Sequence, residues 1–165
     1  MKLYQLHTKQ YLPIIKDTAW KFISDPHNLK KITPKKMDFT LISGTQKPMY
    51  AGQIIHYKVS PFPGFKTKWV SEITQLVAGS YFIDVQMYGP YALWHHKHFI
   101  NSVNGGIEVE DIVDYKIPFG ILGQLAHKLF IRKKILSIFN YREEKLKELF
   151  GTMDHMPTEV HIKSL

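Results

Sequence analysis

A pair of histidines and one aspartate are the residues of this chain best suited to chemistry. His96 and His98 are two positions apart, so on a β-strand their side chains point to the same face. Asp111 follows after a turn. A carboxylate beside an imidazole fixes the tautomer of the ring and raises its pKa, which suits general acid–base catalysis. His98 and Asp111 are therefore the candidate catalytic residues, but the same pair could orient a ligand or hold two strands in register.

A metal site is the second chemistry to consider. His96 and His98 could ligate one ion together, with Asp111 as a third ligand. Zinc sites usually have three or four ligands, and the sequence places no fourth. His95 points to the opposite face, near Asp114, where a surface pair is the simplest interpretation. We therefore expect neither a metal nor another cofactor.

These residues belong to a predicted β-hairpin. The Asn104-Gly105 dipeptide separates two strand-like runs, and Asn-Gly is the strongest short-range hairpin signal because a type I′ turn needs positive φ at both central residues. The shared face is too apolar for a solvent face and too polar for a plain core, which is typical of a cavity wall. Folding at this turn gives four cross-strand pairs: Val103 with Gly106, His98 with Asp111, His96 with Val113, and Trp94 with Tyr115.

The hydrophobic pattern predicts the elements that position this hairpin. A first strand covers residues 2–10, and a short helix begins at Pro13, which suits the first turn of a helix. A second short helix covers residues 26–32. Short turns then join a run of strands, which indicates an antiparallel meander. The six strands of this meander cover residues 37–43, 52–60, 66–76, 81–88, 91–103 and 106–115.

From residue 121 to 150 the apolar period becomes that of a helix. At ~1.5 Å per residue this helix would be ~45 Å long, enough to cross a whole sheet. We predict an α+β fold in which a curved sheet wraps around this helix and leaves a cavity between them. The domain covers residues 1–150, and 151–165 are expected to form a loosely ordered tail. The predicted apolar stripe of the helix is Leu122, Leu125, Leu129, Leu136, Phe139, Leu146 and Phe150.

Composition narrows the function classes. The chain has 165 residues, 44% of them hydrophobic, and no cysteine, which excludes disulfides, thiolate catalysis and cysteine-based zinc sites. The net charge of +8 permits binding to an anionic partner, although a solvated basic surface is the simpler explanation. No nucleic-acid motif appears, and no apolar run reaches the ~20 residues that span a bilayer. The N-terminus lacks the apolar core of a signal peptide, so a cytoplasmic location is the default expectation.

Several segments resemble a known superfamily. They are residues 17–34 (DTAWKFISDPHNLKKITP), 89–99 (GPYALWHHKHF), 111–120 (DIVDYKIPFG) and 138–142 (IFNYR). They are similar to the SRPBCC or START-like superfamily, which includes birch-pollen-allergen-like, polyketide cyclase/dehydrase and lipid-transport members, and above all to its bacterial ligand-binding branch. The resemblance covers residues 1 to about 150. It implies a helix-grip fold with a hydrophobic cavity, and it does not imply one reaction.

The predicted function is the binding, and with it transport or sensing, of a small hydrophobic or amphipathic molecule such as a lipid, a sterol-like or an aromatic compound. Neither nucleic-acid binding nor stable membrane insertion is expected. One alternative is a cyclase or dehydratase of the polyketide type that uses His98 and Asp111. Another is a basic interaction module that docks on an anionic partner. The predicted ligand-binding residues are Tyr57, Trp69, Phe82, Trp94, His96, His98, Asp111, Tyr115, Leu122 and Leu129.

Overall fold

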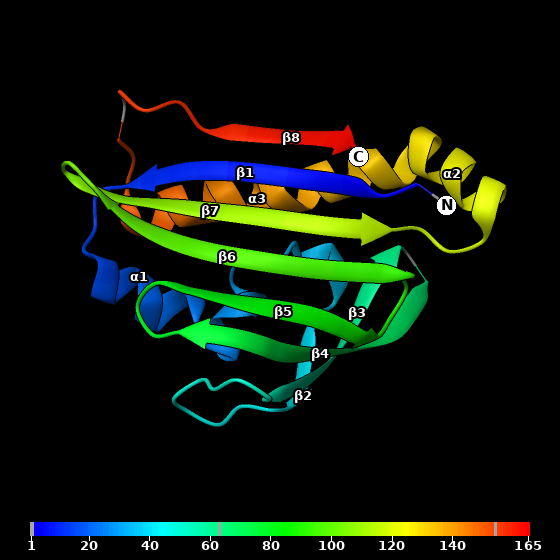
Figure 1. The fold of residues 1–165 in the computed structure, drawn as a ribbon, viewed down its shortest axis with the longest axis horizontal. Coiled ribbons are helices and arrows are strands. Elements are labelled where there is room, and N and C mark those ends of the chain that lie inside the picture. The colour runs from blue at the N-terminus through cyan, green and yellow to red at the C-terminus, as the bar shows by residue number, and fades with distance from the viewer. Residues whose placement is uncertain (1, 63, 154) are drawn as a thin grey trace.

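The strands form a single eight-stranded antiparallel sheet (Figure 1). The computed structural model describes residues 2–62, 64–153 and 155–165. The strand order is β2-β3-β4-β5-β6-β7-β1-β8, so the first strand pairs with the last strand of the meander. The strands are β1 (Tyr4–Leu12), β2 (Thr40–Ser43), β3 (Ile54–Phe62), β4 (Phe65–Val77), β5 (Tyr81–Tyr88), β6 (Leu93–Val103), β7 (Gly106–Lys116) and β8 (Glu159–Ser164).

Burial alternates along β1 and β7, the two strands by which the N-terminal strand pairs with the meander. In β1 every second residue from Tyr4 to Leu12 is buried, and β7 shows the same alternation. The buried side chains of these strands form one face of the sheet and the partly exposed ones the other, because successive side chains of a strand point to opposite sides. This alternation places the polar hairpin residues on the inner face.

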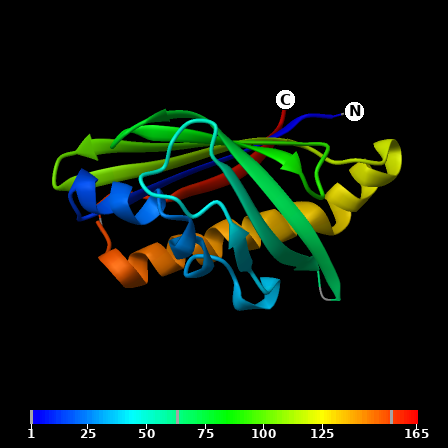
Figure 2. The ribbon, with the colours of Figure 1, turned by 90° about the horizontal axis from the view of Figure 1, so that it is seen from below.

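The helices lie on that inner face of the sheet (Figure 2). A short helix, α1 (Lys16–Ile23), is followed by 3-10 turns at Pro26–Lys30 and Lys35–Met37. The long helix predicted over residues 121–150 is present as α2 (Gly120–Ala126), a π-helical turn (His127–Ile131) and α3 (Arg132–Phe150). The predicted order of one strand, two short helical segments, a meander and a long helix is confirmed.

The first half of the predicted stripe on the long helix is wrong. Leu122, Leu125 and Leu129 are exposed, and the residues buried in their place are Gly123 and His127. The second half is close to the prediction, since the buried side of α3 consists of Ile135, Phe139, Arg142 and Leu146. Helical spacing alone does not say which face of a helix meets the sheet. The contacts of Gly123 and His127 decide it here.

The C-terminal segment also differs from the expectation of a loose tail. Residues 159–164 form β8, which pairs with β1 from Tyr4 opposite Ser164 to Lys9 opposite Glu159. Val160 and Ile162 pack against the core. The segment is ordered because it covers the hydrogen-bonding edge of β1 that would otherwise remain open.

The core has its largest part between β1, β7 and α3. Tyr115, Val113 and Leu6 are fully buried there against Ile135 and Phe139 of α3. In the described parts of the chain, no helix is long and apolar enough to span a membrane. The half of the sheet that β3 to β6 form encloses, together with the helices, the cavity described next.

Candidate ligand-binding site

A cavity of about 1110 Å³ lies between the curved sheet and the helices. Strands β3 to β6 form one wall, and the helical segment from Pro118 to Arg142 forms another. The 3-10 turns that follow α1 contribute Pro26, Leu29 and Met37. Most of the lining is apolar, and its polar side chains concentrate on β4, β5 and β6. Such a mixture is typical of sites that bind small organic molecules.

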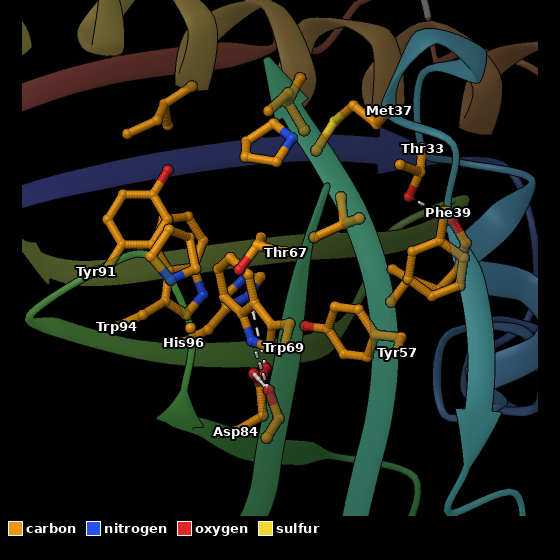
Figure 3. A pocket seen from close by; sticks show the side chains of 18 of the residues that line it. Thr33, Met37, Phe39, Tyr57, Thr67, Trp69, Asp84, Tyr91, Trp94 and His96 are labelled. Atoms are coloured by element: carbon orange, nitrogen blue, oxygen red, sulfur yellow. Dashed lines mark hydrogen bonds and ion pairs between the residues drawn. The ribbon is translucent and has the colours of Figure 1, made fainter. Parts of the chain in front are cut away.

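Aromatic side chains form the centre of the sheet wall (Figure 3). The Trp69 ring stacks on Tyr57 with centroids 5.8 Å apart and meets Trp94 edge-on at 5.5 Å. Tyr91 contacts both tryptophans, and Phe39 packs on Tyr57. Each ring is therefore held by its neighbours, which gives the wall a defined shape.

Beside the aromatic wall lies a buried histidine–carboxylate cluster. The register of β6 and β7 is the one that the Asn104-Gly105 turn predicts, with His98 opposite Asp111 and His96 opposite Val113. Asp111 Oδ1 is 2.8 Å from His98 Nδ1 and 3.1 Å from His96 Nε2. One carboxylate oxygen thus contacts both imidazoles.

Asp84, on β5, is a member of this cluster that the sequence analysis did not select. His98 Nε2 lies 2.9 Å from Asp84 Oδ2, and His96 Nδ1 is 3.6 Å from the same oxygen. Ser71 donates a hydrogen bond to Asp84 Oδ1 and accepts one from the indole N–H of Trp69. A signal was available, because Asp84 is two residues after Phe82 and so shares its face of the strand.

Arg142, from α3, completes the cluster. Its Nη1 atom is 3.5 Å from Asp111 Oδ2, and both side chains are buried. The apolar stripe predicted for this helix did not include Arg142. A buried arginine needs a partner, and Asp111 is that partner. Asp111 therefore lies between the imidazoles and the guanidinium, behind the cavity wall.

The pKa directions agree with this arrangement. Burial alone would raise the pKa of Asp111, but the Arg142 guanidinium and the two imidazoles hold it well below its usual value. Burial also opposes ionisation of Asp84, and the imidazoles outweigh it and lower that pKa. Burial and the charge of His98 lower the pKa of His96 to about 4. For His98, burial is outweighed by Asp111 and Asp84, which raise its pKa. These shifts favour the imidazolium form of His98, which lies between two carboxylates, and the neutral form of His96.

Two groups of described residues have donor atoms close enough to share a metal ion. One is Asp84, His96 and His98 on the cavity wall, and the other is His7, Glu159 and His161 on β1 and β8. In the cavity group Asp84 takes the place that the sequence analysis gave to Asp111. Asp84 Oδ2 faces Nδ1 of His96 and Nε2 of His98. Asp111 Oδ1 faces the other nitrogen of each ring, Nε2 of His96 and Nδ1 of His98. An ion there would have to displace the proton of His98.

The structure brings seven of the ten predicted ligand-binding residues to the cavity. These are Tyr57, Trp69, Phe82, Trp94, His96, His98 and Leu122. The other three do not line it. Asp111 lies behind the imidazoles, Tyr115 is fully buried with its hydroxyl 2.8 Å from His127 Nε2, and Leu129 points outward with 61% of its surface exposed.

Comparison with solved structures identifies the fold. No family model and no curated protein matches the chain. A protein of Thermus thermophilus superposes with a TM-score of 0.65 at 14% identity, over 88% of this chain and 98% of that one. The major latex-like protein 151 of Panax ginseng superposes with a TM-score of 0.65 at 12% identity, over 90% of this chain and 97% of that one. The protein Ara h 8.0201 superposes with a TM-score of 0.58 at 12% identity, over 88% of this chain and 99% of that one. The chain therefore shares the helix-grip fold of these proteins, which is the fold that its sequence predicts.

Proposed function

We propose that this protein binds a small amphipathic molecule in the cavity between the sheet and the long helix. The observation that carries the proposal is a cavity of about 1110 Å³ with an apolar lining and one polar cluster. Ligand pockets usually measure about 300–1,000 Å³, so the space is sufficient for a lipid-sized or polycyclic molecule. Apolar contact alone contributes about 25 cal/mol for each Å² removed from water, which suits an apolar ligand body.

The polar end of the ligand would meet Asp84, His96 and His98. These three side chains line the cavity together with Arg142, whereas Asp111 does not line it and contacts the imidazoles from behind. The raised pKa of His98 favours its imidazolium form, in which this ring and the Arg142 guanidinium balance the two carboxylates. A neutral group that both donates and accepts hydrogen bonds, such as a hydroxyl, suits such a site better than a second charge.

The test is a thermal-shift screen of fatty acids, sterols and aromatic polyketides, combined with mass spectrometry of molecules extracted from the purified protein. Ligands of one class should raise the melting temperature in proportion to the logarithm of their concentration. Absence of stabilisation by every class, and of any co-purifying molecule, would contradict the proposal.

A pair of variants locates the site. Thr67 lines the cavity on β4, and Thr74 is an exposed residue of the same strand. The Thr67→Trp substitution should fill part of the cavity and weaken binding of the best ligand about tenfold or more, because the indole takes the place of ligand atoms. The Thr74→Trp control should bind as the wild type does. Equal affinity of the two variants would place the ligand elsewhere.

A further inference from the structure

The exposed apolar residues before and along α2 form a continuous surface that the fold leaves uncovered. We call this surface the α2 face and define it as Phe119, Ile121, Leu122, Leu125 and Leu129, with exposures of 82, 83, 75, 54 and 61%. Ile121, Leu125 and Leu129 follow one another at intervals of four, so they lie on one side of the helix. Figure 1 shows α2 projecting past the end of the sheet.

The opposite side of the same segment is fixed against the core, so the α2 face cannot turn inward. A Cβ atom at Gly123 would overlap the carbonyl oxygen of Pro118, which shows how closely the helix packs there. His127 stacks on Tyr4 with ring centroids 3.8 Å apart and contacts the Tyr115 hydroxyl at 2.8 Å. The outward orientation of five large apolar side chains is therefore a feature of the packed fold.

The charged residues of the segment that carries the α2 face are all basic. Residues 115–142 contain no aspartate or glutamate, and Lys128, Arg132 and Lys133 are exposed on the segment that follows α2. Lys128 and Arg132 each come three residues after a leucine of the α2 face, Leu125 and Leu129, so they lie beside it on the helix. An apolar helical surface bordered by cations, with acidic residues excluded, is typical of segments that lie in the interface of an anionic membrane.

We propose that the α2 face docks this protein on the surface of bilayers that contain anionic lipid. The apolar side chains would enter the boundary between headgroups and acyl chains, and the cations would contact lipid phosphates, each contributing about 1 kcal/mol near the surface. A docking protein would also cover an apolar face, but 28 consecutive residues (115–142) without a single acid favour an anionic lipid surface.

The α2 face also belongs to the mouth of the cavity. Phe119 and Leu122 line the cavity and are exposed at the same time, so the cavity reaches the surface at this place. Docking would turn this opening toward the lipid. A ligand could then pass between membrane and cavity without crossing water, which is the costly step for an apolar molecule.

The experiment is flotation of the full-length protein with phosphatidylcholine vesicles, with and without phosphatidylglycerol. We expect the wild type to float with anionic vesicles and not with neutral ones, and to dissociate as salt rises. The double variant I121E/L125E should bind at least tenfold more weakly, because two carboxylates replace apolar contact. Loss of two cations in K128Q/K133Q should weaken binding about thirtyfold.

Matched controls carry the same chemistry at other places. Val77→Glu removes an exposed apolar residue at the end of β4, and the turn between β4 and β5 lies beside α1, at the other end of the molecule from α2 (Figure 1). K35Q/K36Q removes two exposed lysines of the second 3-10 turn. V77E should bind vesicles as the wild type does. K35Q/K36Q should also weaken binding, but the logarithm of its affinity should fall by less than a third of the fall in K128Q/K133Q.

Three results would overturn the proposal: no flotation of the wild type with anionic vesicles, equal binding of the wild type and I121E/L125E, or equal losses in the test variants and their controls. A dimer in light scattering that I121E/L125E splits, without vesicle binding, would assign the face to self-association. Vesicle binding needs no cavity ligand, and Ile121 and Leu125 do not line the cavity. Failure of the docking proposal is therefore distinguishable from failure of ligand binding, which the same variants should retain.

Discussion

His98 and Asp111 lie directly opposite each other on β6 and β7, with Nδ1 of the imidazole 2.8 Å from Oδ1 of the carboxylate. The same oxygen contacts His96, and the other carboxylate oxygen faces Arg142. Because Asp111 contacts three side chains from two elements, it holds the cluster together without reaching the cavity. The side chains of the cluster that line the cavity are the two imidazoles, Asp84 and Arg142. Asp111 is therefore placed to hold the imidazoles in position and not to contact a ligand.

We first predict a large loss of stability on removal of the Asp111 charge. Asp111→Asn leaves the buried Arg142 without its counter-charge, which should lower the free energy of unfolding by about 3–5 kcal/mol in urea titrations. The control is Asp114→Asn on the outer face. Asp114 Oδ2 lies 2.7 Å from Nζ of Lys97 in a partly exposed pair, so this substitution should lower the free energy of unfolding by no more than about 1 kcal/mol. Similar losses in the two variants would mean that the buried pair is no stronger than a surface one.

A second prediction concerns the coupling of this pair. In Arg142→Met the helix keeps an apolar side chain of similar length, and the D111N/R142M double variant leaves no buried charge unpaired. Its loss in free energy should be smaller than the sum of the two single losses by about 1–3 kcal/mol. Additive losses would show that Asp111 and Arg142 do not interact energetically at their separation of 3.5 Å.

The third prediction is a stability maximum near pH 6.5 that depends on the two histidines. Folding lowers the pKa of His96 from about 6.5 in the unfolded chain to about 4. The stability that the neutral ring contributes is therefore present above about pH 6.5 and is lost as the pH falls toward 4. The pKa of His98 rises, so its contribution is present below about pH 6.5 and is lost as pH increases through the folded value.

Urea midpoints measured from pH 4 to pH 9 test this prediction. His98→Gln should remove the decline on the alkaline side, and His96→Gln should reduce the decline on the acidic side. The Asp84 and Asp111 carboxyls, whose pKa values are lowered, add a further loss of stability in acid that both variants share. An unchanged alkaline slope in His98→Gln would contradict the raised pKa of His98.

The packing of α2 gives the fourth prediction. Gly123→Ala should destabilise the protein by about 1–3 kcal/mol, because the added methyl group overlaps the Pro118 carbonyl and must push the helix away. Leu125→Ala, two residues later on the exposed side, should change stability by less than about 0.5 kcal/mol. Thermal melts of both variants measure the difference. A larger effect at Leu125 would mean that the α2 face is covered in solution.

The fifth prediction tests β8. Val160 packs on the core from this strand, whereas the neighbouring His161 is exposed. Val160→Asp should lower the free energy of unfolding by about 1–3 kcal/mol and promote aggregation through the uncovered edge of β1. His161→Asp should leave both properties close to those of the wild type. If the two substitutions act alike, β8 contributes little to the stable fold.

The sequence by itself determined the parts of this protein that depend on local geometry. Asn104-Gly105 set the hairpin turn, and strict alternation then placed Trp94, His96 and His98 on one face with the residues opposite them. The order of elements also followed from the change between strand and helix periods. These predictions succeeded because turn conformation and side-chain direction depend on neighbouring residues only.

Only the tertiary structure decided which distant side chains meet. Asp84 reaches the histidines through the pairing of β5 with β6, in which it lies opposite His96, and the Gly89-Pro90 turn signal between these strands does not by itself set that register. Helical spacing allowed the leucines of α2 to face the sheet, and the close packing of Gly123 turned them outward. Contacts between elements far apart in sequence depend on shape and packing in three dimensions, which no local period records.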